Sequence, residues 1–171
     1  MTLDPFISKS GLRCDPYDVN LAVHRSITKL KLPIQVLLVE DDLDAATCTT
    51  AKVSQKLNDM FQVEWKDNVL SAISRLAKPG VDVVLLDLGM PGLGGYRTHL
   101  VIISVVGKTV PVVILTGDDS ATSQHMTKLQ GAASYLIKHR TSSVELRKAL
   151  YEAVVPAMNP QARFRWRISD I

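Results

Sequence analysis

Short apolar runs alternate with longer stretches of mixed character through the middle of the chain. The runs cover residues 34–39, 61–65, 81–86, 110–115 and 133–137. Three of them consist almost wholly of Val, Ile and Leu, which is typical of parallel strands that are covered on both faces. Apolar runs of this length, bounded by polar residues and turn formers, indicate strands. We therefore expect five strands separated by helices.

The stretches between the runs carry helical spacing and capping residues. Asp67 is expected to cap one helix, and Pro79-Gly80 to end it. Its apolar face consists of Val69, Ala72, Ile73, Leu76 and Ala77. Ser142 and Glu145 have the spacing of a capping box that opens the last helix of the repeat. This alternation predicts an α/β fold, a doubly wound five-stranded parallel sheet between two layers of helices.

The repeat is flanked by two segments of different composition. Residues 1–32 form an N-terminal extension, in which Asp15 and Pro16 favour the start of a helix over about residues 16–30. Residues 33–155 form the main domain. Residues 156–171 form a C-terminal tail with the alternating basic and aromatic segment Arg163–Arg167.

Composition and charge indicate a globular protein without a strong charge bias. The chain is 46% hydrophobic and 22% charged, which is typical of a globular domain, and its net charge is +3. Much of that small excess comes from the tail, so general attraction to nucleic acid is not indicated. Binding of nucleic acid or a membrane through Arg163–Arg167 remains an alternative.

Cysteine usage and hydropathy favour a cytoplasmic protein. Cys14 and Cys48 are the two cysteines, too few for a disulfide framework. The N-terminus lacks the basic stretch and apolar core of a signal peptide. The longest apolar-rich piece, 100–106, is far shorter than the ~20 residues of a membrane span.

Polar side chains directly follow all five runs. Glu40-Asp41-Asp42 follow the first run, Asp87 the third, Thr116 the fourth and Lys138 the fifth. The second run, followed by Lys66 and Asp67, is expected at an edge of the sheet, where it need not contribute, and the other four are expected to be central. Because the carboxyl ends of parallel strands meet at one edge, these side chains should lie close together.

This set of residues has a chemical logic. Two carboxylates ~4 Å apart repel by about 4 kcal/mol at an effective dielectric constant of ~20, and a hard cation such as Mg²⁺ would offset that cost. Lys138 and Thr116 could then bind the oxygens of a phosphoryl group. A carboxylate can itself be the nucleophile that forms an aspartyl phosphate.

The motifs VEDD, DLGMPG, LTG and YLIK, in this order, resemble the receiver domain of two-component response regulators, the CheY-like superfamily. The resemblance covers about residues 34–155 and implies the flavodoxin-like (βα)5 fold. It implies that Asp87 is the phosphoacceptor and that Mg²⁺, or Mn²⁺, is the cofactor. It further implies that Asp41 binds the metal directly, Glu40 through water, and Gly89 through its backbone carbonyl.

The resemblance also assigns roles around the phosphoryl group. Thr116 and Lys138 correspond to the phosphoryl-binding hydroxyl and amine, and Tyr135 to the aromatic switch residue. The implied function is that of a single-domain response regulator, not an enzyme beyond its own phosphotransfer and dephosphorylation. Its partners would be a histidine kinase or histidine phosphotransfer protein, an unidentified downstream protein and a second copy in a homodimer. A phosphorylation-independent interaction module is the alternative.

Two features depart from the family pattern. His139 follows Lys138, where most receiver domains have proline. A cis bond before a residue other than proline costs roughly 2.5–4 kcal/mol, so we expect a trans bond here. The segment 100–106 is apolar nearly all round, which favours either cover by the N-terminal helix or a second subunit, or a more buried helix.

Several assignments have competing interpretations. The working acid pair could be Asp41 and Asp42 instead of Glu40 and Asp41, with Asp42 and Asp44 otherwise at the start of the helix. Thr116 could serve only its turn, and Tyr135 could be a core residue. A segment with three glycines, Gly92, Gly94 and Gly95, is expected to be a flexible active-site loop. Three histidines lack the spacing of metal ligands and are expected to be ordinary surface or interface residues: His99, His125 and His139.

Overall fold

The computed structural model describes residues 32–54, 60–92 and 95–158, with side chains up to Val155. These residues all belong to one compact unit of the chain. The helix predicted over about 16–30, Gly94 and the segment Arg163–Arg167 lie outside the described residues.

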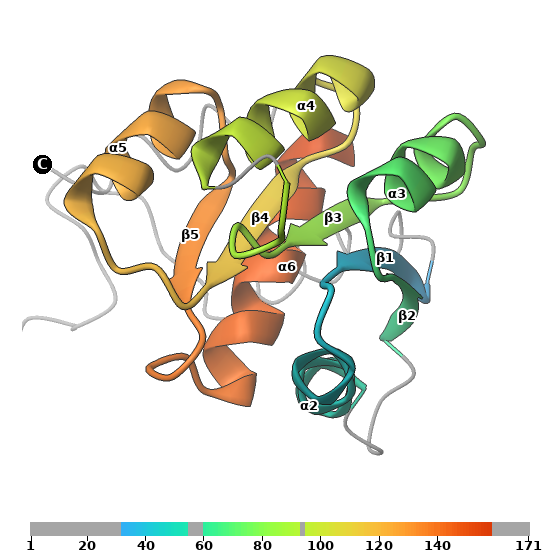
Figure 1. Ribbon diagram of the computed structural model, residues 1–171. Helices are drawn as coiled ribbons and strands as arrows, with labels where there is room; N and C mark the ends of the chain where they lie inside the picture. Colours follow the sequence, from blue (N-terminus) through green and yellow to red (C-terminus); the bar gives the residue numbers. More distant parts are fainter. Residues whose placement is uncertain (1–31, 55–59, 93–94, 159–171) are drawn as a thin grey trace, which may run out of the picture. The chain divides into compact units, whose positions relative to one another are not determined.

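The five apolar runs form the five strands of one parallel sheet (Figure 1). The strands are β1 (Ile34–Val39), β2 (Phe61–Lys66), β3 (Val83–Leu86), β4 (Val112–Thr116) and β5 (Ser134–Ile137). Their order in the sheet is β2-β1-β3-β4-β5. The prediction that the second run lies at an edge is confirmed. The expectation that the fifth run is central is wrong, because β5 forms the opposite edge.

Helices cover both faces of the sheet, which confirms the three-layer α/β/α fold. The helices are α2 (Leu43–Val53), α3 (Val69–Leu76), α4 (Tyr96–Val106), α5 (Ala121–Leu129) and α6 (Ser143–Met158). Figure 1 shows α3, α4 and α5 on one side of the sheet and α2 and α6 on the other. Within the described ranges, none of the helices combines the length and apolar character needed to cross a membrane.

Two predicted helix starts have different outcomes. The capping box that opens α6 is confirmed, since the Ser142 N–H donates to Glu145 Oε2 at 2.8 Å and the Glu145 N–H to Ser142 Oγ at 3.2 Å. The cap of α3 is Asn68 instead of Asp67. The Asn68 side chain accepts from the Ser71 N–H, while Asp67 accepts from the Asn68 side-chain amide at 2.7 Å.

The sheet has a buried core on both faces, since Leu146 and Leu150 of α6 are fully buried as well, and one core cluster lies between the central strands and the helices on the α4 side. Leu37, Val84 and Ile114 are fully buried, and Ile102 of α4 packs among them. The segment 100–106 is nevertheless not buried all round, since the side chains of Leu100 and Val105 are 42% and 41% exposed. Cover of these two side chains by the N-terminal helix or by a second subunit stays a prediction.

Candidate functional site

The carboxyl ends of four strands bring the predicted site residues to one edge of the sheet. Strands β1 and β3 pair in a register that aligns Val39 with Leu86, so Glu40 and Asp87 emerge side by side. The Asp87 N–H donates to the Val39 carbonyl at 3.0 Å. On the other side, the Lys138 N–H donates to the Thr116 carbonyl at 2.9 Å. The backbone ladder of the sheet therefore positions the cluster.

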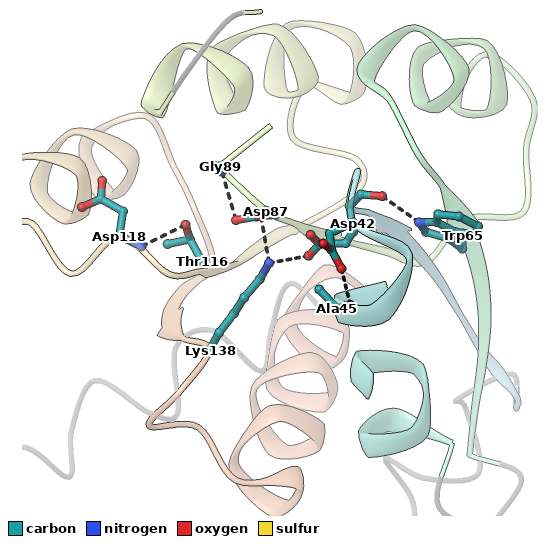
Figure 2. A network of polar contacts seen from close by, with 9 residues as sticks. Asp42, Ala45, Trp65, Asp87, Gly89, Thr116, Asp118 and Lys138 are labelled. Carbon is teal, nitrogen blue, oxygen red and sulfur yellow. Dashed lines mark hydrogen bonds and ion pairs between the residues drawn. The ribbon is translucent and has the colours of Figure 1, made fainter. Parts of the chain in front are cut away.

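The Lys138 ammonium joins two of the acids (Figure 2). Its Nζ lies 2.5 Å from Glu40 Oε2 and 2.8 Å from Asp87 Oδ2. The Glu40 side chain is 2% exposed and that of Asp87 8%, so two carboxylates are held away from water. An uncompensated pair of buried charges would be costly, and the ammonium provides the compensation.

Burial and charge shift the pKa values in this cluster. Burial raises the pKa of Glu40, and the charge of Asp87 adds to the effect, although the hydrogen bond from Lys138 acts in the opposite direction. Burial by itself would lower the pKa of Lys138, but its hydrogen bonds to Asp87 and Glu40 raise the value overall. The site therefore keeps its ammonium charged and favours further positive charge near the acids.

One carboxylate oxygen from each of Glu40, Asp41 and Asp87 lies within 4.8 Å of the others. Asp41 is exposed, whereas Glu40 and Asp87 are buried. A set of oxygen ligands that includes water-accessible positions fits a hard divalent cation such as Mg²⁺ or Mn²⁺. Asp42 is engaged elsewhere, because it caps α2 by accepting from the Ala45 N–H at 2.7 Å (Figure 2). The alternative pair of Asp41 and Asp42 is therefore disfavoured.

A pocket of about 460 Å³ opens beside Asp87. Its lining residues come from the end of β4 and from the loops after β3, β4 and β5, and they include Gly89, Thr116, Asp118 and Lys138. The Thr116 hydroxyl accepts from the Asp118 N–H at 3.3 Å, and the Gly89 N–H donates to Asp87 Oδ1 at 3.0 Å (Figure 2). A Cβ atom at residue 89 would lie 3.1 Å from Asp87 Oδ2, so glycine keeps that carboxylate accessible.

Tyr135 links β5 to the loop that follows β4. Its hydroxyl donates to the Asp118 carbonyl oxygen at 2.7 Å. Burial, followed by the charges of Asp118, Asp119 and Asp87, raises the pKa of Tyr135 to about 12, so the hydroxyl keeps its proton. The ring packs against the core cluster, in agreement with the core interpretation. A role as switch residue stays a prediction.

The predictions for the three histidines, and for the peptide bond after Lys138, are partly confirmed. Among the described residues, the cis peptide bond is Leu32–Pro33, so the bond before His139 is trans as predicted. His125 and His139 are exposed, as expected. The expectation for His99 is wrong, because it is fully buried with Nδ1 at 3.0 Å from Gln130 Oε1. Burial lowers the pKa of His99 and keeps the ring neutral.

Sequence reasoning missed Trp65. Its indole Nε1–H donates to the backbone carbonyl of Glu40 at 2.7 Å (Figure 2), although the prediction did not require a contribution from β2. The signal available was a tryptophan at the end of an edge strand, since an indole N–H that leaves water usually finds an acceptor.

Comparisons with known proteins agree with this geometry. The family model of the response regulator receiver domain matches residues 36–151, a span that contains every candidate site residue. Protein PilH of Pseudomonas aeruginosa is 34% identical over 106 residues, which cover 61% of this chain and 84% of PilH. The two-component response regulator ARR2 of Arabidopsis thaliana is 27% identical over 171 residues, which cover 98% of this chain and 22% of ARR2. The chain thus spans about a fifth of that relative.

A solved structure supports the fold alone. The CheY-like receiver domain protein from Methanospirillum hungatei superimposes with a TM-score of 0.61 at 15% sequence identity. The superposition covers 77% of this chain and 98% of that protein.

Proposed function

The chain belongs to the response regulator receiver domain family of two-component systems, and from this premise we propose that it accepts a phosphoryl group on Asp87. The donor would be a histidine kinase or a histidine phosphotransfer protein. One observation carries the proposal: the Asp87 carboxylate borders an open pocket, with the Lys138 ammonium 2.8 Å away and two further acids beside it.

Each residue of the cluster has a role in the proposed transfer. An Asp87 carboxylate oxygen attacks phosphorus while the bond between phosphorus and the donor nitrogen breaks. Glu40, Asp41 and Asp87 would hold Mg²⁺ or Mn²⁺, with the Gly89 carbonyl as a further ligand. When bound, the cation neutralises negative charge on the carboxylates and the incoming phosphoryl oxygens.

Lys138 and Thr116 complete the proposed phosphoryl site. The Lys138 ammonium, which contacts Asp87 in the structure, can turn to a phosphoryl oxygen, and the Thr116 hydroxyl can donate to another. The product is a signalling state and not a released compound. The same groups would assist the later hydrolysis of the aspartyl phosphate.

The proposed output is a change in protein–protein interaction. Phosphorylation adds about −1.5 to −2 charges, which would draw Thr116 and Lys138 toward Asp87. Thr116 and Tyr135 both contact Asp118 in the loop after β4, which supports a route by which a shift at Thr116 would reach Tyr135. The face made by α5, β5 and α6 would then bind or release a downstream protein, with a coupling of about 1–3 kcal/mol.

We further propose that the receiver occupies residues 33–155, flanked by an extension at 1–32 and a tail at 156–171. The family match over 36–151 supports this division. Cys48 is a free, exposed thiol, which suits the reducing cytoplasm as the place of action.

Phosphorylation with a small donor tests the proposal. We expect acetyl phosphate and Mg²⁺ to add one phosphoryl group to the full chain, measured as intact mass, and EDTA to abolish the gain. Asp87→Asn should remove it, whereas the matched substitution Asp44→Asn, at an exposed position in the first turn of α2, should not.

Slow donor chemistry is controlled by repeating the experiment with phosphoramidate and carbamoyl phosphate over several hours. If no donor gives an Asp87-dependent mass gain, the phosphoacceptor proposal is wrong and a phosphorylation-independent interaction module takes its place.

A further inference from the structure

Edge strand β2 holds the backbone that carries two of the three clustered acids. The Glu40 N–H donates to the Lys66 carbonyl at 3.0 Å, which continues the ladder between β1 and β2 by one residue. The Glu40 carbonyl then accepts from the Trp65 indole N–H at 2.7 Å. Consecutive residues of β2 therefore bind both polar backbone groups of Glu40, one through its backbone and one through its side chain.

The turn after Glu40 has a second anchor on its other side. Asp42 caps α2 through its side chain, and its carbonyl accepts the Ala46 N–H at 2.9 Å. Asp41 lies between these two anchors with an exposed carboxylate. The position of its backbone, and with it the reach of its carboxylate toward Glu40 and Asp87, is therefore set by the anchors on either side. The Trp65 bond acts on the peptide group that joins Glu40 to Asp41.

The Trp65 side chain is only partly buried, and its polar end points toward β1. The residue is 37% exposed and lines a surface groove of about 630 Å³ between β2 and α3, together with Lys66, Leu70 and Arg75. Figure 2 shows its indole nitrogen directed at the end of β1. Part of the ring is exposed and adds little to the core, whereas the indole N–H holds the carbonyl of Glu40, 25 positions away in the chain.

We propose that Trp65 is a positioning residue of the cation site: its indole N–H holds the Glu40 carbonyl and thereby orients the Glu40 and Asp41 carboxylates toward Asp87. This inference rests on the proposed function, because it concerns the cation that phosphotransfer would use. Ligands whose orientation is fixed beforehand bind a metal more tightly, since less freedom is lost on binding. If the bond served only to attach the edge strand, its loss would lower stability without changing cation affinity.

Trp65→Phe tests the inference, because phenylalanine keeps an aromatic ring and lacks the N–H donor. The second tryptophan of the chain provides the matched control, Trp166→Phe. Mg²⁺ binding to the full-length, unphosphorylated protein is measured by titration calorimetry. We expect the Kd of the Trp65 variant to rise about three- to tenfold, the equivalent of one ordinary hydrogen bond, and that of the control to stay unchanged.

Two further readouts separate positioning from simple stabilisation. In phosphorylation by acetyl phosphate, the half-saturating Mg²⁺ concentration should rise in Trp65→Phe, while the rate at saturating Mg²⁺ changes less. In the Trp166→Phe protein, the single indole N–H resonance belongs to Trp65 and should shift during a Mg²⁺ titration. This measurement leaves Trp65 intact, so an unmoved resonance would count against the positioning role even if Trp65→Phe fails to fold.

The outcomes distinguish this inference from the proposed function. If the wild type binds Mg²⁺, Trp65→Phe binds it equally well and the indole resonance does not move, Trp65 has no positioning role and the phosphoacceptor proposal stands. If the wild type binds no Mg²⁺, the cation-dependent function itself is wrong. A weaker Kd together with a shifted resonance establishes the positioning role.

Discussion

Removing the ammonium of Lys138 is the most direct perturbation of the charge balance in the site. Lys138→Met keeps a flexible side chain of similar length and deletes the charge that contacts Glu40 at 2.5 Å and Asp87 at 2.8 Å. We expect the variant to unfold more readily than the wild type in the absence of divalent cations. The reason is that two poorly hydrated carboxylates then face each other without compensation.

The size of the loss follows from the geometry. Charges at the 4.8 Å limit of the acid cluster repel by about 3–4 kcal/mol at an effective dielectric constant of ~20. Breaking a buried ion pair commonly costs about 3–5 kcal/mol. Two effects reduce this figure: the Lys138 side chain is 27% exposed, and Glu40, whose pKa burial already raises, can take up a proton. We therefore expect a loss of about 2–3 kcal/mol near neutral pH.

The pH dependence of this loss has a definite sign. Without Lys138, the pKa of Glu40 in the folded state rises further above its value in the unfolded chain. Proton uptake then favours the folded variant at low pH, and this compensation disappears as the pH rises through the folded pKa. The difference in stability between wild type and variant should therefore grow as the pH rises from the ordinary glutamate pKa of 4.5 through the raised folded-state pKa of the variant.

Urea unfolding with EDTA and with Mg²⁺ measures these effects. Mg²⁺ should stabilise Lys138→Met more than the wild type, because the cation replaces the missing ammonium. The control is Lys148→Met, which breaks an exposed pair with Glu152 at 3.8 Å and should cost at most about 0.5 kcal/mol. The reasoning is refuted if Lys138→Met loses less than the control, or if Mg²⁺ stabilises variant and wild type equally.

Three further predictions concern groups next to the site. Asp42→Ala should cost about 0.5–2 kcal/mol in urea unfolding through loss of the α2 cap, yet leave the Kd for Mg²⁺ unchanged; a large change in Kd would restore the alternative acid pair. Burial lowers the pKa of His99 below its usual 6.5, so the unfolded chain binds more protons just below that pH and stability falls as the pH drops; His99→Asn should flatten this slope in urea titrations from about pH 7.5 to 5, and an unchanged slope would contradict it. Tyr135→Phe should cost about 0.5–1.5 kcal/mol through loss of the bond to the Asp118 carbonyl, and equal stability of the two proteins would show that the bond contributes nothing.

The sequence predicted the strands well where burial decides the structure. The bounds of β1 are those of its apolar run, because every residue in it except the half-buried Gln35 is buried. The run at 110–115 was less accurate at its start, since β4 begins at Val112, after Pro111. Proline has no N–H to donate to the hydrogen bonds of the sheet, and a pattern of apolar residues does not contain that information.

The errors concern choices that depend on contacts distant in the sequence. Asp67 and Asn68 are both favourable N-cap residues, so the spacing of apolar residues does not show which of the two caps α3. His99 lies on an apolar helix, but its burial depends on Gln130, which supplies an acceptor from the end of α5. The position of β5 at an edge likewise follows from the order of the strands, which composition does not encode.

Lys138 and the proposed cation are alternative ways of compensating the same acids. The ammonium contacts Glu40 and Asp87, and both contacts have to weaken if Lys138 is to bind a phosphoryl oxygen. Glu40, Asp41 and Asp87 would hold a cation that compensates the same carboxylates, which would leave the Lys138 ammonium available for the phosphoryl group. Cation binding would therefore prepare the site for phosphotransfer twice, once by lowering the negative charge at Asp87 and once by releasing Lys138. Trp65 fits this scheme from the opposite side of the cluster, since it fixes the acids that must stay in place while Lys138 moves.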